Sequence, residues 1–155
     1  MKSFFIGNEK IKLPIIQGGI GIGVSLSGLA LAVANEGGIG VISCAGLGLI
    51  CKERAEGFIN NNNWGVQEEL CKARELTQGI IGVNIMVVLS NYADLVRTAI
   101  ANKVDIIFSG AGLPLDLPCI RTCDYTKGPY CIANVLYNAA KGNMDKGYAF
   151  AGANA

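Results

Sequence analysis

The segment PIIQGGIGIGVS, from Pro14 to Ser25, places a short apolar run directly before a cluster of glycines. Glycine is used where the backbone needs a positive φ or approaches a ligand closely, and it costs chain entropy elsewhere. A helical period follows, with apolar side chains at positions 26, 29, 30, 33 and 34. The segment therefore predicts a buried strand over 11–19, a glycine loop at a ligand site, and a helix capped by Ser25 at its start and by Asn35 or Gly37 at its end.

The same alternation of strand and helix continues along the chain. Continuous apolar runs predict strands over 39–46, 80–90 and 104–112, and helical periods lie between them at 66–79 and 91–103. Residues 47–64 are interpreted as a connection with a short helix, in which Asn60 to Asn63 form a solvated turn. Strands of this kind, alternating with helices, are typical of a parallel sheet with right-handed crossovers. The predicted fold class is α/β.

The last part of the chain follows a different pattern. Residues 113–129 contain three prolines and no apolar period, so we expect a loop there. A final amphipathic helix is predicted next, with Ile132, Val135, Leu136, Ala139 and Ala140 on its apolar face. The chain of 155 residues is also far shorter than the roughly 250 residues of a complete eight-stranded β/α barrel.

Charge and hydropathy exclude several classes of partner. The chain has 13 Lys and Arg against 12 Asp and Glu, without a basic cluster, so we expect no nucleic-acid ligand. The uncharged run between Lys12 and Glu36 raises the alternative of a membrane span, but Pro14, Gln17 and the glycines divide it into a strand, a turn and a helix. The apolar residues before Asn8 are too few for the core of a signal peptide, which favours a cytoplasmic protein.

Six cysteines are present, and we expect reduced thiols because the chain is 51% hydrophobic and so has enough apolar residues to form a core. Cys119, Cys123 and Cys131 form the tightest group, but their spacing differs from the paired CxxC spacing of structural zinc sites. The chain also contains no histidine. We therefore predict no metal, with a three-thiolate metal or redox site kept as an alternative.

Small and amide-bearing residues recur where the predicted strands end. In parallel α/β sheets the ligand lies beyond the carboxyl ends of the strands. Small residues there leave space for a flat ligand, while amide and hydroxyl groups bind its polar edge. The GxGxxG dinucleotide fingerprint fails at every register, and no strong acid or base suggests a catalytic residue. The strand-end residues are Gln17 to Ile20, Ser43 to Gly46, Asn84, and Ser109 to Gly112.

Four blocks of the sequence resemble the FMN-dependent nitronate monooxygenase family: PIIQGGIGIGVS, EGGIGVISCAGLGL, GIIGVNIMV and VDIIFSGAGLPLDLP. Flavin-dependent enoyl-[acyl carrier protein] reductases share much of this pattern. The resemblance implies a TIM-type (βα) barrel that binds FMN at the strand ends and oxidises alkyl nitronates with O2. It implies that Gln17, Gly18, Gly19 and Ile20 line the flavin ring, that Asn84 contacts its polar edge, and that Ser109 and Gly110 close that side.

The chain departs from the family pattern in its middle. The resemblance implies further βα units between the GAGLPLDLP block and the cysteine-containing tail, but here the two are joined at Pro118 and Cys119. We therefore expect a partial barrel of about four parallel βα units in residues 1–118, and a family tail with an amphipathic helix in 119–155. Four strands cannot close a barrel, which favours a homo-oligomer that covers the sheet edges. A non-catalytic half-barrel fragment and an enoyl-thioester reductase remain alternatives.

Overall fold

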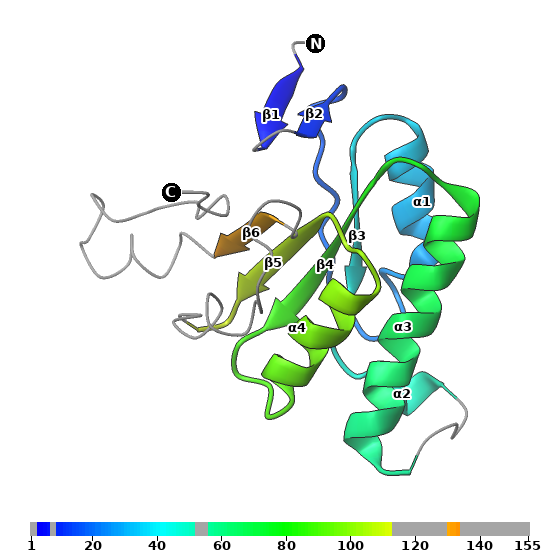
Figure 1. Ribbon diagram of the computed structural model, residues 1–155, viewed down its shortest axis with the longest axis vertical. Coiled ribbons are helices and arrows are strands. Elements are labelled where there is room, and N and C mark those ends of the chain that lie inside the picture. Colours follow the sequence, from blue (N-terminus) through cyan, green and yellow to red (C-terminus); the bar gives the residue numbers. More distant parts are fainter. Residues whose placement is uncertain (1–2, 7–8, 52–55, 113–129, 134–155) are drawn as a thin grey trace, which may run out of the picture.

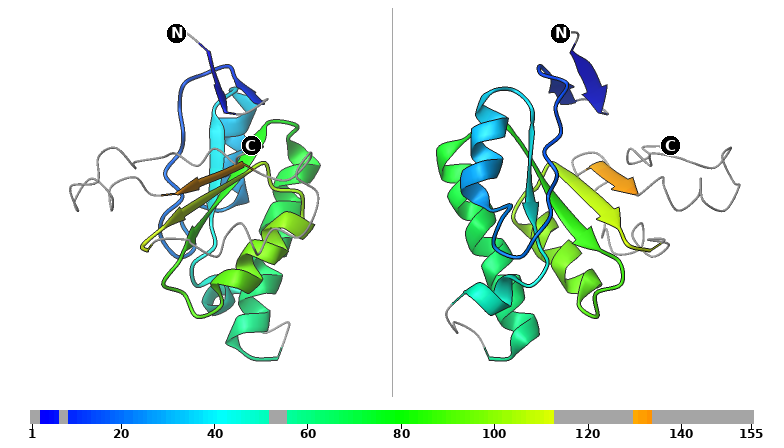
Figure 2. Two further views of the ribbon diagram at one scale, coloured as in Figure 1. Left: turned by 60° about the vertical axis from the view of Figure 1, so that its left-hand side comes forward. Right: turned by 180° about the vertical axis from the view of Figure 1, so that it is seen from behind.

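The computed structural model describes residues 3–6, 9–51, 56–112 and, for the backbone alone, 130–133. Its centre is a parallel sheet in the strand order β3-β4-β5-β6 (Figure 1). Residues before α1 run beside the outer edge of β3, where Ile16 forms a parallel bridge with Ile39 (Figure 2). The predicted α/β fold is thus confirmed, but the predicted buried strand over 11–19 is wrong: beyond Ile11 this segment forms only the isolated bridge, and Ile15 and Ile16 are exposed. The strands are β3 (Ile39–Ser43), β4 (Ile80–Met86), β5 (Ile106–Gly110) and β6 (Tyr130–Ala133).

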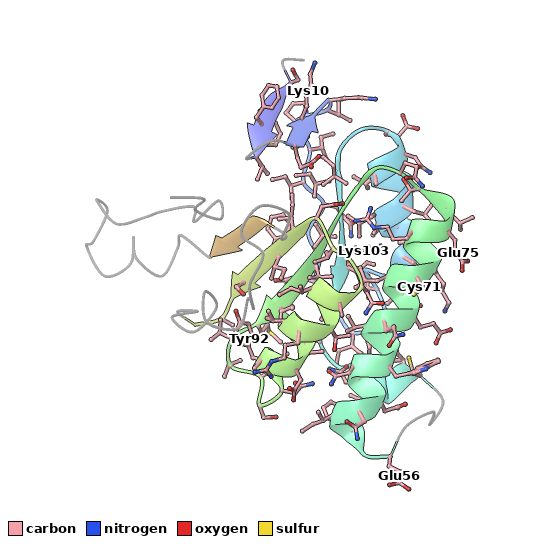
Figure 3. The ribbon with its side chains drawn as sticks, viewed as in Figure 1. Lys10, Glu56, Cys71, Glu75, Tyr92 and Lys103 are labelled. Carbon is pink, nitrogen blue, oxygen red and sulfur yellow. The ribbon has the colours of Figure 1, made fainter. Side chains whose placement is uncertain are left out.

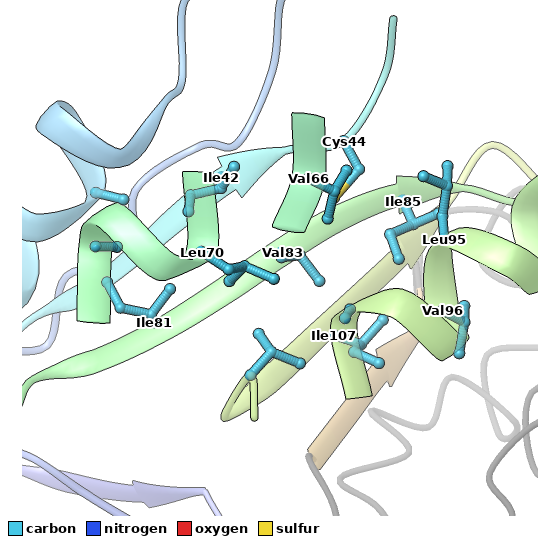
Figure 4. Close-up of a cluster of buried hydrophobic side chains, with 14 of the residues drawn as sticks. Ile42, Cys44, Val66, Leu70, Ile81, Val83, Ile85, Leu95, Val96 and Ile107 are labelled. Atoms are coloured by element: carbon cyan, nitrogen blue, oxygen red, sulfur yellow. The ribbon is translucent and has the colours of Figure 1, made fainter. Parts of the chain in front are cut away.

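One face of the sheet, the helix face, is covered by helices (Figure 1). Apolar side chains at helical spacing pack there against alternate residues of the strands, because successive strand residues point to opposite faces. Figure 4 shows this core, in which Leu70 of α3 lies near Val83 of β4, and Val66 lies near Cys44. The helices are α1 (Ser27–Asn35), α3 (Phe58–Leu76) and α4 (Tyr92–Ala101), and the short α2 (Leu47–Ile50) precedes α3.

The opposite face, here called the inner face, carries a second core at the amino ends of the strands. An antiparallel hairpin of β1 (Phe4–Ile6) and β2 (Glu9–Ile11) lies beside these ends (Figure 1). The sequence analysis did not predict this hairpin, because its strands have only three residues each. The hairpin does not extend to the carboxyl ends of the strands. The second core consists of Ile6, Ile11, Ile39, Val41 and Ile106.

The predicted solvated turn at Asn60 to Asn63 is wrong. These residues lie inside α3, where Asn61 and Asn62 are buried. Asn62 accepts from the Gly48 N–H at 3.0 Å, and Asn61 donates to the Gly48 carbonyl at 2.8 Å. The asparagine amides therefore satisfy main-chain groups of α2 that the short helix cannot pair by itself.

Two expectations about helix ends are also corrected. Ser25 does not cap α1, since the N-cap is Leu26 and carries no side-chain cap. Gly37 does follow the helix with a φ of 88°, as predicted. At the end of the chain, Tyr130–Ala133 form strand β6 beside β5, so Ile132 does not belong to a helix. The expected loop at 113–129 and the rest of the expected helix lie outside the described residues.

Two of the alternatives can be compared with the described part of the chain. None of its helices is long and apolar enough to cross a membrane. It contains no group of three His, Cys, Asp or Glu side chains arranged to hold a metal ion. The side chains of Cys119, Cys123 and Cys131 lie outside the described residues, so the thiolate alternative stays an untested prediction.

Helix α1 and strand β3 approach each other so closely that Gly40 has no room for a side chain. A Cβ atom on Gly40 would lie 1.9 Å from the carbonyl oxygen of Ala30. Because that atom belongs to helix backbone, it cannot move aside as a flexible side chain would. This contact sets the distance between the helix layer and the sheet.

We predict that Gly40→Ala lowers the free energy of unfolding by about 3 kcal/mol or more, since the overpacked contact is with backbone. Gly28→Ala on the same helix is the matched control, because a Cβ there meets nothing within 4 Å. Alanine is the better helix former, so this control should be neutral or stabilising by up to about 1 kcal/mol. Chemical denaturation of both variants measures the difference. Equal effects of the two substitutions would contradict the packing described here.

Candidate functional site

The outer edge of β3 is hydrogen-bonded in three different ways. Ile39 is paired by the preceding segment, because its N–H donates to Ile15 at 2.9 Å and its carbonyl accepts from the Gln17 N–H at 3.0 Å. Val41 is paired by the side chain of Gln17, whose Nε2 donates to the Val41 carbonyl at 3.0 Å and whose Oε1 accepts from the Val41 N–H at 3.1 Å. The Ser43 N–H then donates to the Ser25 carbonyl at 2.8 Å. The chain can therefore leave β3 after Gln17 and return at Ser25.

The residues between these two points, Gly18 to Val24, form the glycine loop. Its conformation is held by the buried Ser25, whose hydroxyl accepts from the Ile20 N–H at 3.2 Å. The same hydroxyl lies 3.1 Å from the Gly18 carbonyl and 3.0 Å from the Ile20 carbonyl, so it can donate to either. Gly21 and Gly23 have φ values of 87° and 73°, which favour glycine. The loop thus has a defined shape.

Asn84 ties the glycine loop to the inner face of the sheet. Its Nδ2 donates to the Gly19 carbonyl at 2.6 Å. Gly19 itself is packed against the sheet, since a Cβ on it would lie 2.4 Å from Val41 Cγ1 and 3.1 Å from the Asn84 Cβ. At Gly18, by contrast, a Cβ would meet nothing within 4 Å. The main chain of Gly18 is therefore open on the side where a side chain would lie, whereas the same side of Gly19 is packed against Val41 and Asn84.

A row of side chains crosses the inner face beside this loop. The strand register pairs Ser43 with Asn84, and Asn84 with Phe108. Paired residues of parallel strands point to the same face, which is also the face of Val41. The ring of Phe108 lies over Gly82, where a Cβ would be 2.7 Å from the ring edge. The inner face thus has hydroxyl and amide groups at its carboxyl end, and the ring of Phe108 lies between them and the second core, against which it packs.

Ser109 is separated from this row by the alternation of the strand. It follows Phe108 and is only 2% exposed, under α4. Its hydroxyl lies 2.7 Å from that of Tyr92, which begins α4 at the carboxyl ends of the strands (Figure 3). The side chain therefore points to the helix face, opposite Asn84. On the inner face Ser109 and Gly110 therefore present only main chain, and the Gly110 carbonyl already accepts from the Val87 N–H at 2.8 Å.

The structure thus brings together most of the residues predicted to bind the cofactor, but not all of them. The segment Gln17 to Ile20 and Asn84 lie side by side, joined by the hydrogen bond to Gly19. Both polar atoms of the Gln17 amide already bond to Val41, and the Ile20 side chain is 76% exposed. The sequence analysis missed Phe108. Alternation along 104–112 could have indicated it, but only the strand register shows that Phe108 lies beside Asn84.

A buried carboxylate lies at the amino end of α1, behind the glycine loop. Glu69 of α3 accepts from the Ser27 N–H at 2.9 Å and from the Ser27 hydroxyl at 2.7 Å. Burial raises the pKa of Glu69, but the hydrogen bonds from Ser27 and Lys72 outweigh it and hold the pKa below its ordinary value. The carboxylate is therefore charged at neutral pH, which suits a helix amino end.

Cys44 lies near the site but does not supply a reactive thiol. It follows β3 on the helix face, within the helix-side core. Complete burial raises the pKa of this thiol far above its ordinary value. Because the thiolate is the nucleophilic form, Cys44 acts as a small core residue.

This geometry defines the class of an α/β half-barrel with a glycine loop beside the carboxyl end of β3. The sequence model of the nitronate monooxygenase family matches residues 2–127. The chain therefore belongs to the nitronate monooxygenase family. None of the curated proteins matches the sequence significantly.

Two solved structures extend the comparison. FabK from Thermotoga maritima is similar with 24% sequence identity and a TM-score of 0.60, covering 86% of this chain and 38% of FabK. A mutant of the same FabK gives 25% identity and a TM-score of 0.65, covering 90% of this chain and 41% of that chain. The present chain thus spans about two fifths of the length of these structures.

Gly19 and Gly18 allow a direct test of how the loop is seated. We predict that Gly19→Ala lowers the free energy of unfolding by about 1–3 kcal/mol, because the new methyl group displaces Val41 or breaks the hydrogen bond to Asn84. Gly18→Ala should change it by less than about 0.5 kcal/mol, since its methyl group points into open space. Thermal or chemical denaturation of the two variants provides the comparison. A larger loss for Gly18→Ala would show that the loop is seated differently.

Proposed function

We propose that this chain is an FMN-binding oxidoreductase unit that acts on alkyl nitronates with O2. The observation that carries the proposal is the open main chain of Gly18, next to Gly19, whose carbonyl accepts a hydrogen bond from Asn84 at the carboxyl end of the inner face. Parallel α/β sheets bind their ligands at this end. Family membership supports a flavin as that ligand, and FMN is our choice among the flavins.

The chemistry of the site residues fits the ring system of a flavin. Gly18 lets a flat ring approach the main chain without meeting a side chain. Asn84 uses its Nδ2 for Gly19 and keeps Oδ1 as an acceptor for a ring N–H. Phe108 adds an aromatic surface, and the Ser43 hydroxyl lies on the same face. When bound, FMN would supply the electron acceptor for oxidation of the substrate.

The amino end of α1 does not fit the phosphate group of FMN. A helix amino end after a glycine loop is an ordinary phosphate site, but here the Glu69 carboxylate bonds to its first N–H. A phosphate would meet a like charge at this position. Binding by the present chain should therefore depend mainly on the ring.

Apolar side chains around the glycine loop suit an alkyl substrate. Ile20, Ile22 and Val24 are 76%, 50% and 68% exposed, and they project from the loop that borders the proposed ring site. Apolar surface of this kind favours the alkyl part of a nitronate over a highly charged substrate. We assign no catalytic residue, since no acid or base belongs to the row of Ser43, Asn84 and Phe108.

A non-catalytic half-barrel is the second candidate. Its support is the length of the chain, which covers only 38–41% of the FabK structures. The segment that pairs the outer edge of β3 forms the edge of this half-barrel, and its Ile15 and Ile16 are 45% and 47% exposed. Self-association that covers this edge remains part of both proposals. An enoyl-thioester reductase activity is a further alternative from the sequence resemblance.

Flavin binding tests the proposal. The purified chain is titrated with FMN and with riboflavin while flavin fluorescence is recorded, and native mass spectrometry gives the number of subunits. We predict dissociation constants for the two flavins that agree within about threefold, because the amino end of α1 offers no charge-assisted contact to phosphate. Gly18→Ala should weaken both by about fivefold or more at unchanged stability, since its methyl group occupies the space of the ring. Gly28→Ala is the control and should leave both constants unchanged.

Measurements of turnover by the flavin-loaded protein then distinguish between the candidate functions. Oxygen uptake with propane-2-nitronate by the flavin-loaded protein supports the nitronate oxidase assignment. Flavin binding without uptake supports the non-catalytic half-barrel, and flavin-dependent reduction of an enoyl thioester by an added hydride donor supports the third activity. A folded chain that binds neither flavin would contradict the proposal.

A further inference from the structure

We propose that Glu69 is a positioning residue that holds the glycine loop in its ligand-ready shape from the side opposite the flavin. The inference concerns the loop itself, and only its effect on flavin affinity rests on the proposed function. Glu69 lies on α3, 42 residues after its partner Ser27 on α1. It has no place in the row of residues proposed to touch the ring.

The contacts of Glu69 replace a cap that the sequence of α1 lacks. The N-cap residue Leu26 has no side chain that can accept a hydrogen bond, and no side-chain cap is formed. The Oε2 atom of Glu69 accepts from both the N–H and the hydroxyl of Ser27, at 2.9 and 2.7 Å. Ser27 is buried, so removal of the carboxylate would leave two buried donors without this acceptor.

Two anchors then fix the glycine loop at its distal end. Ser25 clamps Gly18 and Ile20 through its hydroxyl and bonds to Ser43 through its carbonyl. Ser27, two residues later, is held by Glu69. If the first turn of α1 frays, Ser25 is no longer held in the position from which its hydroxyl bonds to Gly18 and Ile20. The packing of Gly19 against the sheet, and with it the exposure of Gly18, therefore depends on a carboxylate that bonds to neither glycine.

The charge of Glu69 is balanced by neighbours on its own helix. Lys72 donates to Oε1 of Glu69 at 3.0 Å, and the same ammonium group lies 2.8 Å from Glu68. Glu68 also forms an ion pair with Lys72 but makes no hydrogen bond to Ser27. The two glutamates therefore differ in the interaction with Ser27. Helix α3 thus contains a matched control residue next to the proposed one.

The test combines local amide hydrogen exchange with flavin affinity. In Glu69→Ala we expect the amides of Ile20 and Ser43 to exchange about tenfold faster, as for the loss of charge-assisted hydrogen bonds, while amides in the centre of β4 keep their rates. The dissociation constant for FMN should rise by a similar factor. Glu69→Gln should restore much of both properties, because its amide oxygen can still accept from Ser27. Glu68→Ala should change neither.

The outcomes distinguish the inference from the proposed function. Unchanged exchange at Ile20 and Ser43 in Glu69→Ala would overturn the inference, whatever happens to flavin binding. Faster loop exchange in a protein whose unaltered form binds no flavin would support the inference and overturn the proposed function. If Glu69→Ala unfolds, Ser27→Ala serves instead, because it removes only the hydroxyl contact. Uniform acceleration across loop and sheet in Ser27→Ala would then show a purely global effect and overturn the inference.

Discussion

The outer edge of β3 is the constraint on which the rest of the site depends. A strand edge presents main-chain N–H and C=O groups that must be paired when they are buried. Here the preceding segment pairs Ile39, the side chain of Gln17 pairs Val41, and the carbonyl of Ser25 pairs Ser43. Because Gln17 takes the place of main chain, Gly18 and the residues after it are released from the sheet. The same hydrogen bonds that complete the sheet therefore also create the glycine loop.

The two faces of the sheet have different roles: the helices pack on one face, and the candidate site lies on the other. On the helix face, apolar residues and the Tyr92–Ser109 hydroxyl pair fix the helices against the strands. On the inner face, the hairpin lies beside the amino ends, and the carboxyl ends carry Asn84 and Phe108. Ser109 and Asn84 both lie near strand ends, yet the strand period of two places their side chains on opposite faces. Nearness to a strand end is thus not sufficient for a place in the site.

Much of the fold follows from local periodicity in the sequence. The strands β3, β4 and β5 and the helices α1 and α4 appear where apolar spacing predicts them. Features that depend on distant partners could not be predicted in this way. The residue type of Asn61 and Asn62 predicts a turn, but in the structure their amides bond to the main chain of α2. The hydrogen bonds from Ser27 to Glu69 likewise join residues that are 42 positions apart. Strand β6 likewise depends on pairing with β5, which overrides the helical spacing around Ile132.

The candidate site also combines features that the sequence predicts with features that depend on contacts between distant residues. Sequence and family resemblance predicted Gln17 to Ile20 and Asn84, and the structure places these residues together. The structure adds that the Gln17 amide completes the sheet and that Gly19 packs against Val41, while the expected contacts with the flavin stay a prediction. Gly18 is then the glycine whose exposed main chain can meet a ligand. Such a distinction between neighbouring glycines requires knowledge of what surrounds each one.

The most direct test of this account is an NMR titration of isotope-labelled protein with FMN, read at individual backbone amides. We predict saturable shifts at Gly18 to Ile20, Asn84 and Phe108, where the glycine loop meets the inner face. Amides in the middle of α3 and α4 should stay unchanged, since these helices cover the opposite face. Saturable shifts confined to the helices, or no shifts at the glycine loop, would contradict the claim that this loop forms the flavin site.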